Sequence, residues 1–182
     1  MAFLAWRSGM IAYALGLARL LPACLAYLAD RDRGRLKAAA VRVFLRGMDK
    51  AGLEASCDDF AGSSLGRRLI RPDAEQCWRS WQARGAELVI VTASPEEVVA
   101  PFARLLGADR LIGTRLLYDS DGRVSGAFQG GNCRGAEKVA RLEAIYGEGV
   151  RLVAAYGDSS GDTELLGLAD ERGYRVFTGR PG

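Results

Sequence analysis

Two aspartates, Asp158 and Asp162, stand four positions apart directly after an apolar run, in the segment RLVAAYGDSSGDTELLGLAD. Only the small residues Ser159, Ser160 and Gly161 separate them. Carboxylate oxygens suit magnesium, which takes one or two protein carboxylates and keeps several of its waters. The pair therefore indicates a magnesium site, although two aspartates in a loop also serve commonly as caps of a following helix.

Thr92 and Lys138 add groups that suit a phosphate. Thr92 follows the apolar run LVIV and offers a hydroxyl. The backbone N–H groups of Ala93 and Ser94 come next, at the start of a predicted helix, a place that attracts anions. Lys138 lies inside a later predicted helix and provides a cation. Each residue alone has an ordinary structural explanation, but carboxylates, hydroxyl and lysine together are typical of a site that handles a phosphoryl group.

The composition excludes several other chemistries. The chain of 182 residues contains no histidine, which rules out a Ser-His-Asp triad, a Cys-His pair and His-ligated zinc. Its four cysteines are scattered and form no CxxC pair, which is typical of thiols in a reducing cytoplasm. We therefore place the chain in the cytoplasm and expect acid–base work from carboxylates.

Strand and helix patterns alternate from about residue 71 onward. They predict helices over 71–85, 94–109, 132–147 and 160–170, the second with Ser94 as N-cap, and strands over 86–94, 151–158 and 174–177, with a strand and hairpin over 111–130 that turns at Asp121 and Gly122. Such alternation predicts an α/β fold, a parallel sheet with helices on both faces. Ligands of such sheets bind at the carboxyl ends of the strands, where Thr92 and Asp158 both lie.

The N-terminal part has a different texture. Between residues 11 and 29 the only charge is Arg19, and Pro22 interrupts the run. A turn over 30–34 and a second, basic helix to about Met48 complete a helical hairpin. Residues 1–50 contain nine Lys and Arg against three Asp. We therefore expect an apolar, basic α-helical lobe over 1–66 and an α/β core over 67–182.

Three interpretations compete for this helical lobe. A signal peptide or a membrane span would need a cleaner apolar centre than Arg19 and Pro22 allow. A plain cap would bury its leucines, Leu15, Leu17, Leu20 and Leu25, against its own bundle. A lobe that lies at a membrane interface would use the basic residues that follow the apolar run, Arg31, Arg33, Arg35, Lys37, Arg42 and Arg46. In that case residues 1–50 would touch the inner face of the membrane.

The segments IVTASPEE, NCRGAEKVARL and YGDSSGDTELL resemble motifs two, three and four of the haloacid dehalogenase superfamily, in its phosphoserine-phosphatase-like subfamily IB. The resemblance covers about residues 65–177 and implies a magnesium-dependent phosphatase with a Rossmannoid core. By it, Thr92, Ala93 and Ser94 would bind the phosphoryl group, and Lys138 would steady negative charge at the nucleophile. Asp158 would ligate Mg²⁺ and Asp162 would support the metal shell, with Ser94, Ser159 and Asn132 as weaker candidates.

The family's first motif, a strand ending in DxDx[TV] that carries the nucleophile and the general acid, is absent. The DxD at Asp30 to Asp32 follows an Ala/Leu-rich run and precedes Arg33 and Gly34, which favours a turn between helices. We therefore expect that the first core strand is missing and that the chain starts downstream of it. A relative that truly lacks the nucleophile, and only binds phosphate and metal, is the alternative.

The apolar hairpin followed by CRGAEKVARLE and DSSGD looks most like the phosphatidylglycerophosphatase C type, which acts on a lipid phosphate. The resemblance thus implies a phosphomonoester on a phospholipid head group as substrate. A small metabolite such as phosphoserine, under an ordinary apolar cap, is the alternative. We expect no nucleic-acid partner.

Overall fold

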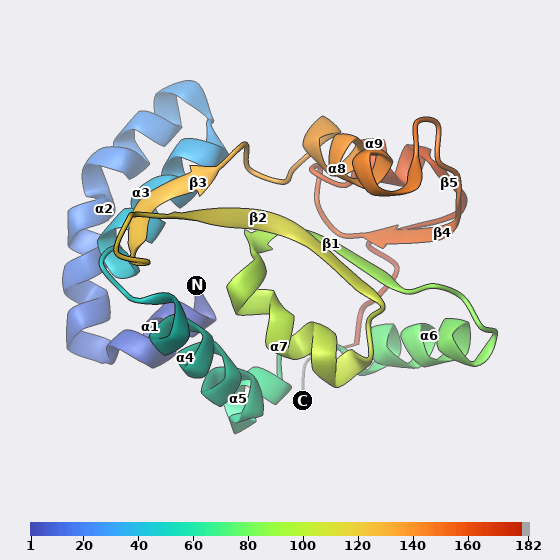
Figure 1. Ribbon diagram of the computed structural model, residues 1–182, viewed down its shortest axis with the longest axis horizontal. Coiled ribbons are helices and arrows are strands. Elements are labelled where there is room, and N and C mark those ends of the chain that lie inside the picture. The colour runs from blue at the N-terminus through green and yellow to red at the C-terminus, as the bar shows by residue number, and fades with distance from the viewer. Residues whose placement is uncertain (180–182) are drawn as a thin grey trace. The chain divides into compact units, whose positions relative to one another are not determined.

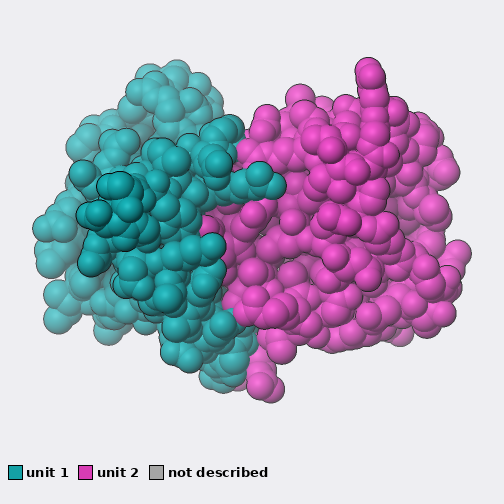
Figure 2. All heavy atoms as spheres, in the orientation of Figure 1, with its two compact units in different colours: residues 1–66, 115–131 teal, residues 67–114, 132–182 magenta. Residues whose placement is uncertain are grey.

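The computed structural model describes residues 1–179, and it divides into two compact units. One unit comprises residues 1–66 and 115–131, and the other comprises residues 67–114 and 132–179 of the described chain (Figure 2). The sequence placed residues 115–131 with the core, whereas here they group with the helical lobe. The physical reason is close packing of strand β3 on helix α3: a Cβ on Gly126 would lie 3.2 Å from the Arg42 Cα.

The first unit is mainly helical (Figure 1). Its helices are α1 (Ala2–Ser8), α2 (Met10–Asp30), α3 (Arg33–Phe44), α4 (Lys50–Gly62) and the start of α5 (Ser64–Arg67). Strand β3 (Val124–Gln129) pairs antiparallel with the last residues of β2 (Arg110–Tyr118). The buried side chains of this unit form its core: Phe3, Leu20, Val41, Leu45, Leu53, Cys57, Phe60, Ala61, Leu116 and Val124.

The second unit holds the parallel strands. β1 (Val89–Pro95) pairs with the first half of β2, and β4 (Leu152–Gly157) pairs with β5 (Ala169–Tyr174), both in parallel. The helices of this unit are α6 (Pro72–Ala83), α7 (Glu96–Leu106), α8 (Ala136–Tyr146) and α9 (Thr163–Gly167). Its core contains Ile112, Cys133, Leu142 and Leu165, with Val89, Val91 and Leu152 packed against them. The predicted α/β class, with parallel strands and helices, is confirmed.

The parallel strands of the second unit, β1, β4 and β5, each have one unpaired edge within the described residues. Within residues 1–179, β1 has β2 as its partner and β4 has β5, and the two pairs form separate sheets. All seven residues of β1 are only half-buried, and Val153 of β4 is 66% exposed. Strands inside a parallel sheet are normally covered on both faces. Within the described residues, the parallel strands of this unit therefore form two separate pairs with unpaired edges.

Two local predictions need correction. The last strand is Ala169–Tyr174 and not 174–177, because its residues pair in register with β4 from Leu152 to Gly157. Helix α7 begins at Glu96, with Pro95 as its N-cap, so Ser94 does not cap it. The predicted turn at Gly122 is confirmed, since this residue has φ of 72° between β2 and β3.

The segment from Asp30 to Asp32 is a turn between helices, as the sequence predicted. Asp30 is the last residue of α2, and Arg31 adopts a left-handed conformation with φ of 56°. Asp32 caps α3 and accepts hydrogen bonds from the N–H groups of Gly34 and Arg35. This DxD therefore has a capping role and does not end a strand.

Helix α2 is long and apolar enough, by length and composition, to cross a membrane, but that criterion is also met by core helices and by signal sequences. Only 11% of its most apolar 18-residue window is buried, so it is not a core helix of this chain. Its buried residues are Gly16 and Leu20. A Cβ on Gly16 would lie 2.3 Å from the Phe44 ring, which shows how closely α2 and α3 approach.

Candidate functional site

A cavity of about 380 Å³ in the second unit brings the predicted site residues together. Its walls come from the carboxyl ends of β1 and β4, from α8 and from the loops that follow β4 and β5. It is lined by all six predicted residues, Thr92, Ala93, Ser94, Lys138, Asp158 and Asp162, and by Ser159. Asn132 lies elsewhere and accepts a hydrogen bond of 3.2 Å from the buried Thr114 hydroxyl. The roles assigned to these residues stay predictions.

Lys138 is a buried lysine that spans two elements. It lies in the first turn of α8 and is 5% exposed. Its Nζ donates to the Val91 carbonyl at 2.7 Å and to Asp162 Oδ1 at 2.6 Å. Buried charges need a partner, and this ammonium group has both a carboxylate and a carbonyl. The ion pair thus holds α8 against the end of β1 and against the loop after β4.

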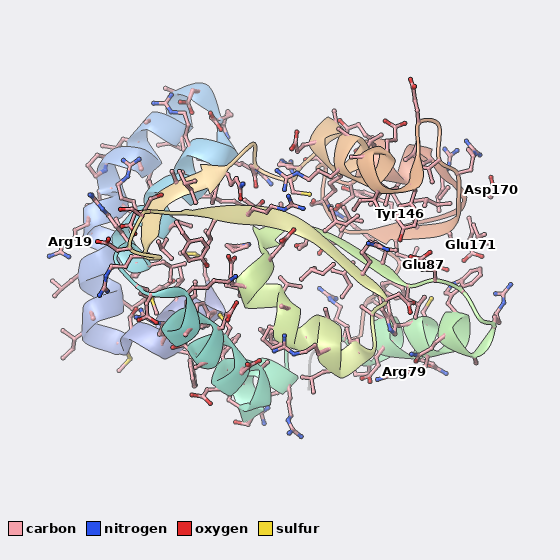
Figure 3. All side chains as sticks on the ribbon, in the orientation of Figure 1. Arg19, Arg79, Glu87, Tyr146, Asp170 and Glu171 are labelled. Carbon is pink, nitrogen blue, oxygen red and sulfur yellow. The ribbon has the colours of Figure 1, made fainter. Side chains whose placement is uncertain are left out.

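The far end of α8 is fixed as well. The Tyr146 hydroxyl donates a hydrogen bond to the Glu87 carboxylate, just before β1, and accepts one of 3.2 Å from Arg110 Nε (Figure 3). Burial raises the pKa of Tyr146, and the hydrogen bond to Glu87 raises it further. Tyr146 therefore stays protonated and keeps its donor. Both ends of α8 are tied to the strand that carries Thr92.

Asp162 is fully engaged by protein groups. Its Oδ1 accepts from Lys138, and its Oδ2 accepts from the Ser159 N–H at 3.0 Å and from the Ser159 hydroxyl at 2.8 Å. Burial alone would raise the pKa of Asp162, but the hydrogen bonds from Lys138 and Ser159 and the charge of Lys138 outweigh it, so the pKa lies below its ordinary value. Asp162 is therefore an ionised carboxylate that positions Lys138 and the 158–162 loop.

Asp158 differs from Asp162 in its surroundings. Its side chain is exposed at the cavity, and within residues 1–179 its carboxylate accepts no hydrogen bond and forms no ion pair. Its backbone carbonyl accepts a hydrogen bond of 2.9 Å from Arg175 Nε, which fixes the loop. A fixed backbone with a free carboxylate is the arrangement a cation ligand needs.

Thr92 lies in the middle of β1 and lines the same cavity as these acids. Its Oγ1 accepts a hydrogen bond of 3.1 Å from the Ser94 N–H, so the hydroxyl proton remains to be donated. The Ala93 carbonyl accepts a hydrogen bond of 2.9 Å from Thr114 Oγ1, which fixes the backbone that follows Thr92. A hydroxyl donor on a fixed strand suits an oxygen of a phosphate.

Two glycines let the loop fold tightly around its own side chains. A Cβ on Gly157 would lie 2.5 Å from the Asp162 Cβ, and one on Gly161 would lie 1.9 Å from Arg134 Nη1. The contact at Gly157 is too short for a real side chain, so this position needs glycine, whereas at Gly161 the Arg134 side chain would have to move. The small residues of the motif thus make room for Asp162 and Arg134.

Gly157→Ala is expected to destabilise the chain by about 1–3 kcal/mol, because the new methyl group overpacks the Asp162 side chain. Gly167→Ala is the matched control, since a Cβ there meets no atom within 4 Å. It should be neutral or stabilise by up to about 1 kcal/mol, through helix propensity. Urea unfolding of both variants measures the difference. Equal unfolding midpoints for the two would contradict the packing described here.

Three arginines of the cavity wall were not predicted from the sequence: Arg71, Arg134 and Arg175. Arg134 donates to the Ser160 hydroxyl at 2.8 Å, and Arg71 donates to the Phe177 carbonyl at 3.1 Å. Arg175 has φ of 54° directly after β5, which turns the chain back toward Asp158. With Lys138, the lining holds four basic side chains and two acidic ones. The only sequence signal for Arg134 is its place inside the NCRGAEK segment.

The donors of the cavity fit a magnesium ion, although the described residues contain no group of three or more acidic or thiol ligands. Magnesium needs one or two protein carboxylates, and waters and phosphate oxygens complete its shell. Asp158 offers the free carboxylate. Asp162 already accepts hydrogen bonds at both oxygens, which fits the supporting role expected for it better than a direct bond to a metal.

A helical unit and a parallel-strand unit, with threonine, lysine and paired aspartates in one cavity, are consistent with a Rossmannoid α/β fold. The family model of haloacid dehalogenase-like hydrolases matches residues 1–167, and the chain belongs to this family. Protein CicA of Caulobacter vibrioides (strain NA1000 / CB15N) is 57% identical over 180 residues, which cover 99% of this chain and 80% of that protein.

Two further relatives carry phosphatase names. A histidinol-phosphatase of Neisseria meningitidis serogroup C (strain 8013) is 31% identical over 108 residues, which cover 56% of this chain and 49% of that protein. A solved phosphoserine phosphatase in a substrate-bound complex has a TM-score of 0.56 at 20% identity, over 79% of this chain and 67% of that chain, and shares the fold. The family and these relatives support a phosphatase activity in general terms.

Proposed function

We propose that this chain carries the metal- and phosphate-binding part of a magnesium-dependent phosphomonoester hydrolase. The observation that supports this most directly is the unpartnered Asp158 carboxylate in one cavity with Thr92 and the buried Lys138. Four basic side chains on the cavity wall suit a dianionic phosphate. Bound magnesium would neutralise charge on the phosphate and on Asp158.

Each of the three residues Thr92, Lys138 and Asp162 has a defined role in this proposal. The Thr92 hydroxyl donates to a phosphate oxygen. Lys138, held by Asp162 and by the Val91 carbonyl, keeps a fixed positive charge at the cavity floor. Asp162 keeps that lysine in place. Such preorganised charges stabilise the negative charge that develops during phosphoryl transfer.

The attacking group is the part that the described residues do not supply. The chain has two Asp-x-Asp pairs, and neither lines the cavity: Asp32 of the first caps α3, and the second, Asp119 and Asp121, forms the turn after β2, where Asp119 accepts hydrogen bonds from the N–H groups of Asp121 and Arg123. This favours a second candidate function, a module that binds phosphate and metal without turnover. A nucleophile-bearing strand placed on the unpaired edge of β1 would bring its carboxylates to the level of Thr92.

The chain itself is expected to show no measurable hydrolysis of para-nitrophenyl phosphate in magnesium. A version extended at its N-terminus by a strand ending in Asp-x-Asp-x-Thr should hydrolyse it, because the added carboxylates reach the phosphate held in the cavity. The matched control carries the same extension with its first Asp changed to Asn. Steady-state turnover is the measurement, and full activity of the unextended chain would overturn the proposal.

For the substrate we favour a phosphate on a lipid head group over a small metabolite such as phosphoserine. What supports this is the exposed apolar surface of α2: of the four leucines that a plain cap would bury, Leu20 is buried, but Leu15, Leu17 and Leu25 are 59%, 41% and 66% exposed. Comparison of kcat/KM for phosphatidylglycerophosphate and for phosphoserine in the extended protein separates the two substrate classes.

A further inference from the structure

Helix α2 presents a continuous apolar stripe to the outside of its unit. The stripe residues recur every three or four positions, and they are Met10, Ala14, Leu17, Leu21, Leu25 and Leu28. Met10 is 89% exposed, Leu21 60% and Leu28 64%. Ile11 and Leu15 flank the stripe and are exposed as well. Large apolar patches of this kind on a folded surface mark a place where something binds.

We infer that this stripe is a docking surface for an anionic lipid bilayer, with α2 lying in the plane of the interface. This goes beyond the proposed phosphatase function and does not depend on it. An amphipathic helix binds in this way when its apolar side chains enter the boundary of the acyl chains and basic residues meet the headgroups.

The opposite face of α2 is fixed within its own unit. Leu20 is 3% exposed, and Gly16 lies against the Phe44 ring, where no larger residue would fit. The Tyr13 and Phe44 rings stack with their centroids 5.5 Å apart. A helix that spans a bilayer contacts lipid along its whole length, on every side that protein does not cover. Helix α2 instead packs along one side on helix α3, which is polar and basic. The packing therefore favours a helix on the surface over a spanning one.

Basic residues occur on α2 and in the segment that follows it. Arg19 is the only charged residue between Met10 and Ala29, and its exposed side chain lies on the outer side of α2 (Figure 3). Exposed Arg31, Arg33, Arg42 and Arg46 follow the C-terminal end of the helix. Each basic residue near an anionic surface contributes attraction of about 1 kcal/mol. This charge complements anionic headgroups.

A second copy of the chain fits the stripe less well. Residues 1–50 carry nine basic residues against three acidic ones. Pairing two stripes would bring two surfaces of the same sign together, which disfavours association. An anionic bilayer offers the opposite sign along with an apolar phase. The charge pattern thus selects lipid as the occupant.

The test is flotation of the full chain with vesicles of phosphatidylcholine alone or mixed with phosphatidylglycerol. The chain should float with the mixed vesicles, less with the neutral ones, and the difference should shrink in high salt. Leu21→Glu with Leu25→Glu should weaken binding to both by at least about 30-fold, because two leucines no longer insert. Leu65→Glu with Leu105→Glu is the matched control, at exposed leucines outside α2, and should bind as the parent does.

A charge pair of variants completes the test. Arg31→Gln with Arg33→Gln should weaken binding to the mixed vesicles alone, by about 30-fold. Arg67→Gln with Arg68→Gln removes the same charge from exposed residues elsewhere and should have little effect. Circular dichroism checks that every variant is folded. Absence of flotation with either vesicle, or a dimer in sedimentation that the Leu21 and Leu25 changes dissociate, would overturn the inference.

Discussion

Asp158→Asn is expected to abolish the effect of magnesium on phosphate binding by this chain. The Asp158 carboxylate is the one acid of the cavity wall that no protein group within residues 1–179 engages. An amide cannot supply the charge that holds a divalent cation beside a phosphate. In the wild type, magnesium and phosphate should strengthen each other's binding by about 5- to 150-fold, the usual range for coupled sites. In Asp158→Asn the presence of magnesium should leave the affinity for phosphate unchanged.

The structure also supplies the control for this change. Asp121→Asn removes the same charge from an exposed turn between β2 and β3 and should leave the coupling intact. Because Asp158 is exposed, its replacement should change the free energy of unfolding by no more than about 0.5 kcal/mol. In the strand-extended protein, Asp158→Asn should lower kcat by on the order of 10³-fold. Coupling that persists in Asp158→Asn would remove this residue from the metal site.

The second large effect is expected at the buried pair of Lys138 and Asp162. Their side chains are 7% and 10% exposed, and the Nζ to Oδ1 distance is 2.6 Å. Lys138→Met or Asp162→Asn leaves one buried charge without its partner, which costs about 3–5 kcal/mol of stability. The double variant should cost less than the sum of the two by more than about 1 kcal/mol, because neither charge remains.

An exposed pair provides the comparison. Arg151 Nη2 lies 2.8 Å from Asp170 Oδ1, but the two side chains are 61% and 71% exposed. Asp170 is labelled on β5 in Figure 3. Asp170→Asn should cost less than about 1 kcal/mol. Urea unfolding of all four variants gives the free energies. Additive losses at Lys138 and Asp162, or losses no larger than at Asp170, would show that the pair does not hold the site together.

The same pair gives stability a pH dependence of known sign. The pKa of Asp162 is below its ordinary value in the folded chain, so the ionised form is favoured by folding. The stability it contributes is present above the unfolded pKa of about 4 and is lost as the pH falls through the folded pKa. Asp162→Asn should lose this part of the acid sensitivity, which unfolding curves at several pH values below 5 measure.

The strands that carry the site could be predicted because their signals are local. LVIVT and LVAAYG are short apolar runs rich in residues that favour strands, and each ends where a small or polar residue begins a loop. Thr92 and Asp158 each follow or end such a run, and the structure brings both to one cavity although β1 and β4 belong to separate sheets. Lys138 could be predicted as a site residue from the periodicity of its helix and from the resemblance of its segment to a known motif.

The remaining features depend on contacts between distant parts of the chain. Arg71 and Arg175 line the cavity because of the way the chain runs near β5. No short sequence pattern predicts that arrangement. The last strand was misplaced because ADERGY has little strand character by itself and forms a strand by pairing with β4. Periodicity in an Ala/Leu-rich helix likewise could not tell which face of α2 would stay exposed.

The most direct test of the central claim is a calorimetric titration of the wild-type chain with inorganic phosphate, with and without magnesium. The claim is that Asp158, Thr92 and Lys138 form one site for a phosphate and a magnesium ion. We predict tighter phosphate binding in magnesium, by at least about fivefold, and loss of this gain in Asp158→Asn. Phosphate affinity that is the same with and without magnesium, or that magnesium improves equally in wild type and variant, would contradict it.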